Sequence, residues 1–252
     1  MGEHGLEGRS EDALLWTRRR GFLHAAAAWT AMGGWAAAHA QQRSNVVELR
    51  GDALLNGQAL RQEQTIQSGD RVETGPGGHL IFVVGNSAWH LRENTSIRVE
   101  RGETLNVVSV LRIVTGAVVS VWGKGSSRQI VTPTLTAGIR GTGLYTEVRP
   151  DENLRTYFCN CYGTVDLSAG RDATTSRAEY HQSFWAEPAP RDGRLLTPAR
   201  AINHTDEELE YLAALVGQRT AWEVTGRRGA KEGTGYTDPT VPHPLLQQPP
   251  RR

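Results

Sequence analysis

Two cysteines and two histidines are the residues of this sequence best suited to chemistry. Cys159 and Cys161 are the only cysteines of the chain, and they lie two positions apart in a stretch typical of a β-strand. Side chains alternate between the two faces of a strand, so both sulfurs are expected on one face. His181 and His204 follow in a more polar part of the chain. Folded back over the strand, they would complete a ligand set for zinc or iron.

The spacing of the two cysteines suits a metal better than a disulfide. In a strand, the Cα atoms of Cys159 and Cys161 would be about 6.6 Å apart, whereas a disulfide needs Cβ atoms about 3.5–4.5 Å apart. Two thiolates on one tetrahedral zinc ion lie about 3.8 Å apart, which side-chain rotation can reach. Glu179 and Asp206 are oxygen donors that could replace a histidine. Three other interpretations stay open, namely buried thiols, a disulfide formed after distortion or between chains, and a catalytic cysteine.

The elements that would position these residues are mostly short β-strands. From residue 46 to residue 169, short segments rich in Val, Ile, Thr and aromatic residues alternate with Gly, Pro and Asn breaks. This spacing predicts a mainly β roll or sandwich with about ten or more strands. Trp89 and Trp122 are expected to pack in it. His90, in the alternating segment AWHLR, is expected at a solvated position.

The chain after residue 169 is predicted to be different in character. Residues 170–217 are expected to be irregular and to end in one short helix. Thr205 and Glu208 form a capping box that would start this helix at about residue 206, and Gly217 would end it. Residues 218–252 are rich in Gly, Pro and Arg, so they are predicted to be a disordered tail.

The N-terminus reads as an export signal. The sequence RRGFL at 19–23 resembles the twin-arginine (Tat) motif, and a weakly apolar run follows it. Ala-His-Ala at 38–40 is a small-x-small pattern that a signal peptidase could cut. Residues 1–40 are therefore predicted to be a Tat signal peptide, which would place the mature chain in the periplasm, or to anchor it if uncleaved. No later apolar run reaches membrane length.

Export by this route bears on the cysteines. A Tat substrate folds in the cytoplasm, where thiols are held reduced. A metal could therefore be loaded before transport. The net charge of +1 over 252 residues gives no electrostatic case for binding nucleic acid. No acid–base pair stands at a recognisable spacing, so the chain is not expected to be an enzyme.

Three motifs in residues 41–169 resemble the FecR domain, a periplasmic module of an iron-citrate signalling regulator and its relatives. In order they are IQSGDRVETGPGGHLIFVVGNSAWHLRENTSIRV, then IVTPTLTAGIRGTGLYTEV, then GTVDL. The resemblance implies a β-domain that binds or senses a small ligand or protein partner in the envelope. About 20 residues precede the export motif, too few for the regulator's sigma-factor-binding region, so sigma-factor regulation is not implied. A structural or scaffold role in an envelope complex, without a metal, is the alternative.

Overall fold

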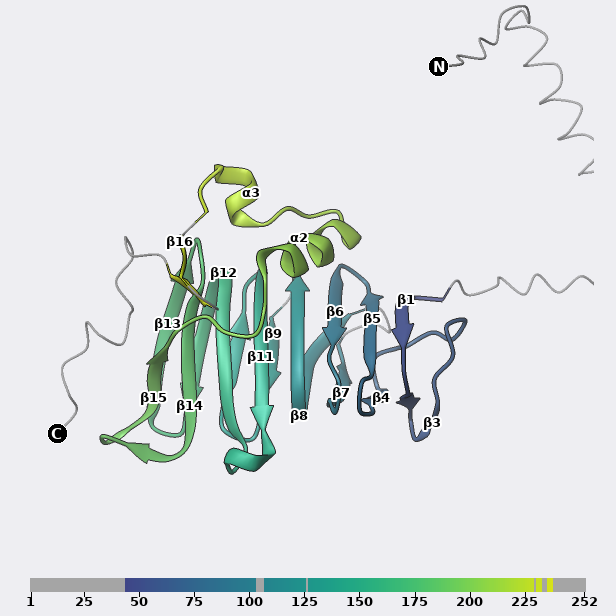
Figure 1. The fold of residues 1–252 in the computed structure, drawn as a ribbon, viewed down its shortest axis with the longest axis horizontal. Helices are drawn as coiled ribbons and strands as arrows, with labels where there is room; N and C mark the ends of the chain where they lie inside the picture. Colours follow the sequence, from purple (N-terminus) through teal and green to yellow (C-terminus); the bar gives the residue numbers. More distant parts are fainter. Residues whose placement is uncertain (1–43, 103–106, 126, 229, 233–234, 238–252) are drawn as a thin grey trace, which may run out of the picture. The chain divides into compact units, whose positions relative to one another are not determined.

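The structure is a computed structural model that describes residues 44–102, 107–125, 127–228, 230–232 and 235–237 (Figure 1). These residues belong to one compact unit. The predicted signal peptide and the end of the predicted tail lie outside the described residues. The mainly β prediction is confirmed, since fifteen strands join in one hydrogen-bonded network.

The strands form two layers that share their two longest members. The first layer contains β1 (Val46–Arg50), β5 (His79–Val84), β6 (Ser87–Leu91), β11 (Thr142–Arg149), β14 (Gln182–Arg191) and β15 (Arg194–Ala199). The second contains β2 (Ala53–Leu55), β3 (Gln58–Ala59), β4 (Arg71–Thr74), β7 (Ser96–Arg101), β9 (Arg128–Val131), β10 (Thr136–Ile139) and β13 (Asp172–Ala178). The shared strands are β8 (Val108–Trp122) and β12 (Arg155–Ala169).

Each shared strand passes from one layer to the other at a glycine. Gly116 divides β8 and Gly163 divides β12, and both have positive φ, at 82° and 103°. A Cβ atom at Gly116 would lie 2.3 Å from the Thr95 hydroxyl, and one at Gly163 would lie 2.7 Å from Thr142 Cβ. Only glycine combines this conformation with such close approach. The sequence predicts short segments separated by glycine breaks, but at these two glycines the chain continues as one long strand.

Two hydrophobic cores follow from the alternation of side chains along these strands. The first lies between the two layers and holds residues such as Phe158. The second covers the outer face of the first layer and holds Tyr157, Cys159 and Cys161. Because β12 is buried on both faces, the segment TYFCNCY is apolar almost throughout, as expected for a central strand.

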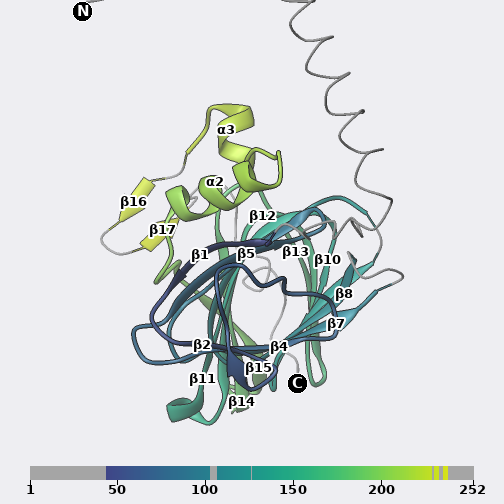
Figure 2. The ribbon, with the colours of Figure 1, turned by 90° about the vertical axis from the view of Figure 1, so that its right-hand side faces the viewer.

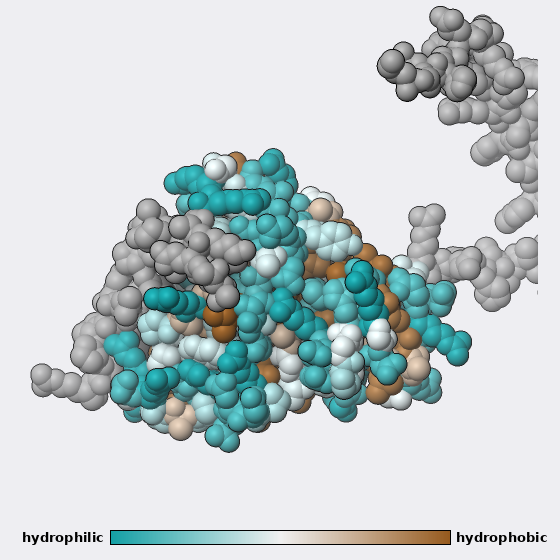
Figure 3. Space-filling model, in the orientation of Figure 1, coloured by the Kyte–Doolittle hydropathy of each residue, from teal (hydrophilic) through white to brown (hydrophobic). Residues whose placement is uncertain are grey.

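Helices α2 (Asp206–Leu215) and α3 (Ala221–Thr225) cover the second core. Figure 2 shows them together on one side of the strands. The capping box of Thr205 and Glu208 is confirmed, and Leu209 and Leu212 are buried against the sheet. The face in Figure 3 is mostly hydrophilic, with hydrophobic residues gathered over β1, β5 and β6 beside α2.

Two predictions about the second half of the chain are wrong. Residues 170–200 are not irregular, because they form β13, β14 and β15. Nor is the chain structureless from residue 218, because α3 buries Trp222 almost completely. A short hairpin of β16 (Ala230–Glu232) and β17 (Gly235–Thr237) follows. The only other helical turn in the described ranges is η1 (Pro150–Glu152). None of the described helices has the length and hydrophobicity to span a bilayer.

Candidate metal centre

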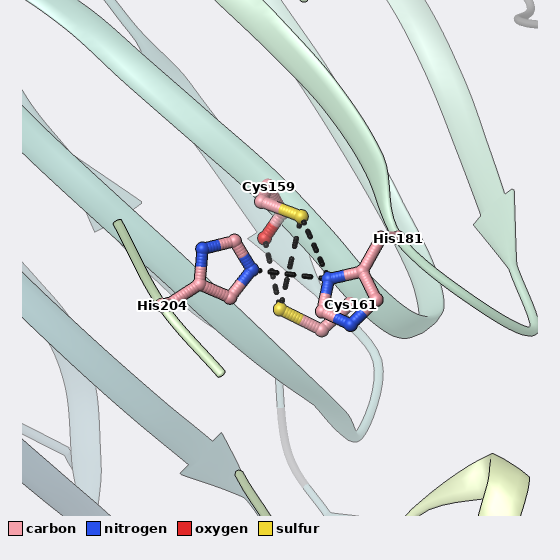
Figure 4. Close-up of side chains that lie close together, drawn as sticks. All are labelled: Cys159, Cys161, His181 and His204. Atoms are coloured by element: carbon pink, nitrogen blue, oxygen red, sulfur yellow. Dashed lines mark hydrogen bonds between the residues drawn. The ribbon is translucent and has the colours of Figure 1, made fainter. Parts of the chain in front are cut away.

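The two cysteines and the two histidines converge in the second core (Figure 4). Cys159 and Cys161 point to the same face of β12, as their spacing predicts. His181 lies in the turn between β13 and β14, and His204 lies directly before the N-cap of α2. One ligand atom from each of the four residues lies within 4.8 Å of the other three. All four residues are buried.

Three of the distances among the four ligand atoms are close to those around a tetrahedral ion. Standard zinc bond lengths require about 3.8 Å between two sulfurs, about 3.5 Å between sulfur and nitrogen and about 3.3 Å between two nitrogens. The sulfurs of Cys159 and Cys161 are 3.8 Å apart. Cys159 Sγ lies 3.5 Å from His181 Nδ1, and that nitrogen lies 3.0 Å from His204 Nε2. The donor set and its spacing therefore fit zinc.

The far nitrogen of each imidazole is held by an oxygen acceptor. His181 Nε2 lies 3.0 Å from a carboxylate oxygen of Asp206, and Tyr180 donates its hydroxyl to the other oxygen. His204 Nδ1 lies 2.7 Å from the carbonyl oxygen of Ile202. Protons on these far nitrogens leave the lone pairs of Nδ1 and Nε2 facing the cysteines, as metal-binding histidines require. Asp206 therefore orients a ligand and does not serve as one.

Aromatic rings close the site from the sides. His204 stacks on Tyr145 with ring centroids 4.8 Å apart, and His181 stacks on Trp222 at 5.5 Å. His181 has a positive φ of 24°, and its N–H donates to the carbonyl of Cys161. Residues other than glycine rarely adopt positive φ, and such strain concentrates at functional sites. The fold therefore constrains this ring from several directions.

Burial and the mutual contacts of the cluster shift the pKa of both cysteines and of His181. Burial opposes ionisation of Cys159, but the hydrogen bond from Cys161 and the nearby imidazoles hold its pKa well below the usual value. Burial, followed by the effect of Cys159, raises the pKa of Cys161 well above the usual value. Burial opposes the charge on His181, yet Cys159 and Asp206 raise its pKa to about 9. The Cys159 thiolate and the Asp206 carboxylate thus stabilise a positive charge at His181.

Two residues considered from the sequence lie elsewhere. Glu179 turns outward and pairs with Arg227 at 2.9 Å, so it is no ligand. His90 is not solvated, because α2 covers it and leaves it 8% exposed. Both cysteines are free thiols, and no disulfide forms between them. Sequence reasoning missed that Asp206 orients His181 and that aromatic rings enclose the site. The only signals were that Tyr180 adjoins His181 and that Asp206 lies two residues after His204.

Comparisons with known proteins give little further. No protein-family model matches the sequence, and no curated protein matches it. Two crystal structures of proposed anti-sigma factors from Parabacteroides distasonis are similar in part. One is 13% identical to this chain with a TM-score of 0.41, and the match covers 51% of this chain and 59% of that one. The other is 12% identical with a TM-score of 0.43, over 65% of this chain and 95% of that one. Likeness at this level carries no functional argument.

Proposed function

We propose that this chain is an exported, non-enzymatic β-domain of the FecR type, whose C-terminal part is fastened to the sheet by one zinc ion. The observation that carries the proposal is the convergence of four buried ligand atoms from three separate segments. A site with four protein ligands and no free position is typical of structural zinc, because catalytic zinc keeps a position open for water or substrate.

Zinc suits this site better than the alternatives. Two thiolates with two imidazoles are a common structural zinc set, and zinc binds such a set in tetrahedral geometry. Iron accepts the same donors, so the identity of the metal is part of the test. The ion would connect β12, the turn at His181 and the start of α2, and these segments are distant in sequence. Metal binding would then contribute directly to folding.

Export and an envelope partner complete the proposal. The twin-arginine motif at 19–23 supports passage of the folded chain with its metal into the periplasm. The three FecR-like motifs support a role in binding or sensing an envelope protein or small ligand. Because the zinc centre is closed, the zinc ion would not contact the envelope protein or small ligand. It would affect binding only through the stability of the domain.

The metal is tested by analysis of the full chain produced in bacteria without added metal. We expect about one zinc per chain, and a large fall in Tm when a strong chelator removes it. Protein that carries no metal as purified, and whose Tm is unchanged by chelator and by added zinc, would contradict the proposal. The exposed pair Arg140–Asp166 supplies a control, since Arg140→Gln should change neither zinc content nor the response to chelator.

Export is tested separately from the metal. The double variant Arg19→Lys/Arg20→Lys should keep the precursor in the cytoplasm, because the twin-arginine receptor reads both arginines. Arg18→Lys changes the adjacent arginine by the same chemistry and should leave export unchanged. Equal export of all three proteins would remove the Tat assignment and leave the zinc proposal standing.

A further inference from the structure

A second pair of histidines faces each other on the same side of the first layer. His79 begins β5, and His90 lies in the neighbouring strand β6. Nε2 of His90 is 2.9 Å from Nδ1 of His79, and the ring centroids are 4.2 Å apart. Neither ring belongs to the cysteine cluster. The distance between facing nitrogens nearly equals the 3.0 Å between the two histidines of the zinc centre.

A carboxylate stands near the far nitrogen of each ring. Nε2 of His79 lies 3.7 Å from Glu48, and Nδ1 of His90 lies 3.4 Å from Glu208. The His79 Nε2 atom is buried and has no hydrogen-bond partner among the described residues. A second carboxylate–histidine pattern, of the kind that orients metal ligands, therefore surrounds this pair.

Counting protons shows that two neutral imidazoles leave one far nitrogen of this row without a proton for its carboxylate. Two neutral imidazoles carry two protons, and one of them lies between the facing nitrogens. One far nitrogen then presents a lone pair to a carboxylate, which is repulsive. A metal ion bound by both facing lone pairs would put a proton on each far nitrogen, directed at Glu48 and Glu208. Arginines partly balance these carboxylates, through Arg50 at 2.6 Å from Glu48 and Arg92 at 2.8 Å from Glu208.

The pair is accessible, unlike the zinc centre. A pocket of about 350 Å³ opens over it, between β5, β6 and α2. Its lining includes both histidines, Glu207 and Tyr211, and the side chain of His79 is 30% exposed. Coordination positions not filled by the two imidazoles would therefore face solvent or a ligand.

We infer that His79 and His90 form a second, open site for a divalent transition-metal ion such as zinc, which exchanges with the medium. Imidazole nitrogen is a ligand that zinc, copper and nickel share. The site would hold its ion through two protein ligands and leave the rest to water or to a donor group from a small molecule. It does not depend on the cysteine cluster, because no residue is common to the two sets.

The test is equilibrium dialysis of the full wild-type chain against rising free zinc. Bound zinc should increase from one to two equivalents, and a weak chelator should remove only the second. In His79→Gln the affinity for the second equivalent should fall at least about tenfold. Arg71→Gln breaks an exposed ion pair with Glu73 and changes no residue of the pocket lining, so it should retain the second equivalent.

Two outcomes would overturn the inference. One is a wild-type chain that binds no equivalent removable by the weak chelator, and the other is a weakly held equivalent that binds His79→Gln as tightly as wild type. If His79→Gln does not fold, Glu48→Gln replaces it, with an expected loss of about tenfold in affinity. If the cysteine cluster bound no zinc, wild type would bind one weak equivalent that is lost in His79→Gln, so failure of either site is recognised separately.

Discussion

The cysteine cluster and the His79–His90 pocket contain the same arrangement of imidazoles in two different surroundings. In both, two ring nitrogens face each other at about hydrogen-bond distance, 3.0 Å in one and 2.9 Å in the other. In both, oxygen acceptors stand near the far nitrogens. The first pair adds two thiols and is sealed by aromatic rings, whereas the second opens into a pocket. The donors other than the two imidazoles set the character of each site. Two protein thiols would complete a closed structural site, whereas water or a small molecule would leave the metal free to exchange.

The two sites also differ in what they join. The cysteine cluster connects β12 with a turn 20 residues later and with the start of α2, using positions 159, 161, 181 and 204. The second pair lies on β5 and β6, which already pair through five registered residue positions. Metal at the first site should therefore stabilise the fold, and metal at the second should change it little.

The largest expected effect is the loss of one thiolate. Cys161→Ser should lose the zinc and lower the free energy of unfolding by more than about 4 kcal/mol, a size seen when a metal site is destroyed. Zinc content and chemical denaturation measure both effects. His79→Gln is the matched comparison at the open site, where we expect a loss of about 1 kcal/mol or less. Similar losses in both variants would mean that the two sites do not differ in structural role.

The next effect tests how Asp206 orients His181. Asp206→Asn should weaken zinc binding at the cysteine cluster by about 10–100-fold, because the carboxylate that holds the far imidazole nitrogen is lost. Competition with a chromogenic chelator measures the change. Glu207→Gln is the control, since it removes a neighbouring charge from the same first turn of α2 without touching either imidazole. Equal effects in both variants would assign the loss to the helix dipole.

The sequence was enough to predict the cysteine cluster for a simple reason. Side chains alternate along a strand, so the spacing of Cys159 and Cys161 placed both sulfurs on one face. His181 and His204 were the next two histidines along the chain, and the capping box of Thr205 fixed where α2 begins. These inferences used local geometry, and the structure agrees with each of them.

Features that depend on distant contacts were missed. His90 looked solvated because its strand alternates, but α2, more than 100 residues later, covers that face and brings Glu208 to it. Residues 170–200 looked irregular because they are polar, and they contain Pro188, Pro190 and Pro198. Prolines are tolerated at strand ends and edges, and here they lie in β14 and in β15, which pairs with a single neighbour.

A smaller effect concerns pH at the loop that carries His204. Burial opposes the charge of Glu147, but hydrogen bonds from Asn203, Tyr145 and Arg149 keep its pKa below the ordinary 4.5. A carboxyl whose folded pKa is lowered contributes stability above its unfolded pKa, and this contribution is lost as the pH falls below about 4.5. Glu147→Gln should therefore be less stable than wild type by about 1–2 kcal/mol at pH 7.

The stability difference between these two proteins should shrink as the pH falls from 5 toward 3. Chemical denaturation at several pH values measures it, and the comparison cancels the effect of acid on the zinc ligands that both proteins share. Glu179→Gln serves as the control because it breaks an exposed ion pair with Arg227 and leaves the partners of Glu147 unchanged. A difference for Glu147→Gln that stays constant down to pH 3 would contradict the assigned pKa.

The smallest expected effect concerns the start of α2, where the two sites come closest in sequence. Thr205 caps the helix directly after His204, and its backbone N–H donates to Glu208, which faces His90. Thr205→Ala removes the capping hydroxyl and should cost about 1 kcal/mol of stability. The backbone N–H remains, so neither zinc equivalent should change. Thr220→Ala removes the equivalent cap from α3 and is the control. If Thr205→Ala alone releases the tightly bound zinc, then the cap positions His204, and the closed and open sites are coupled through this helix end.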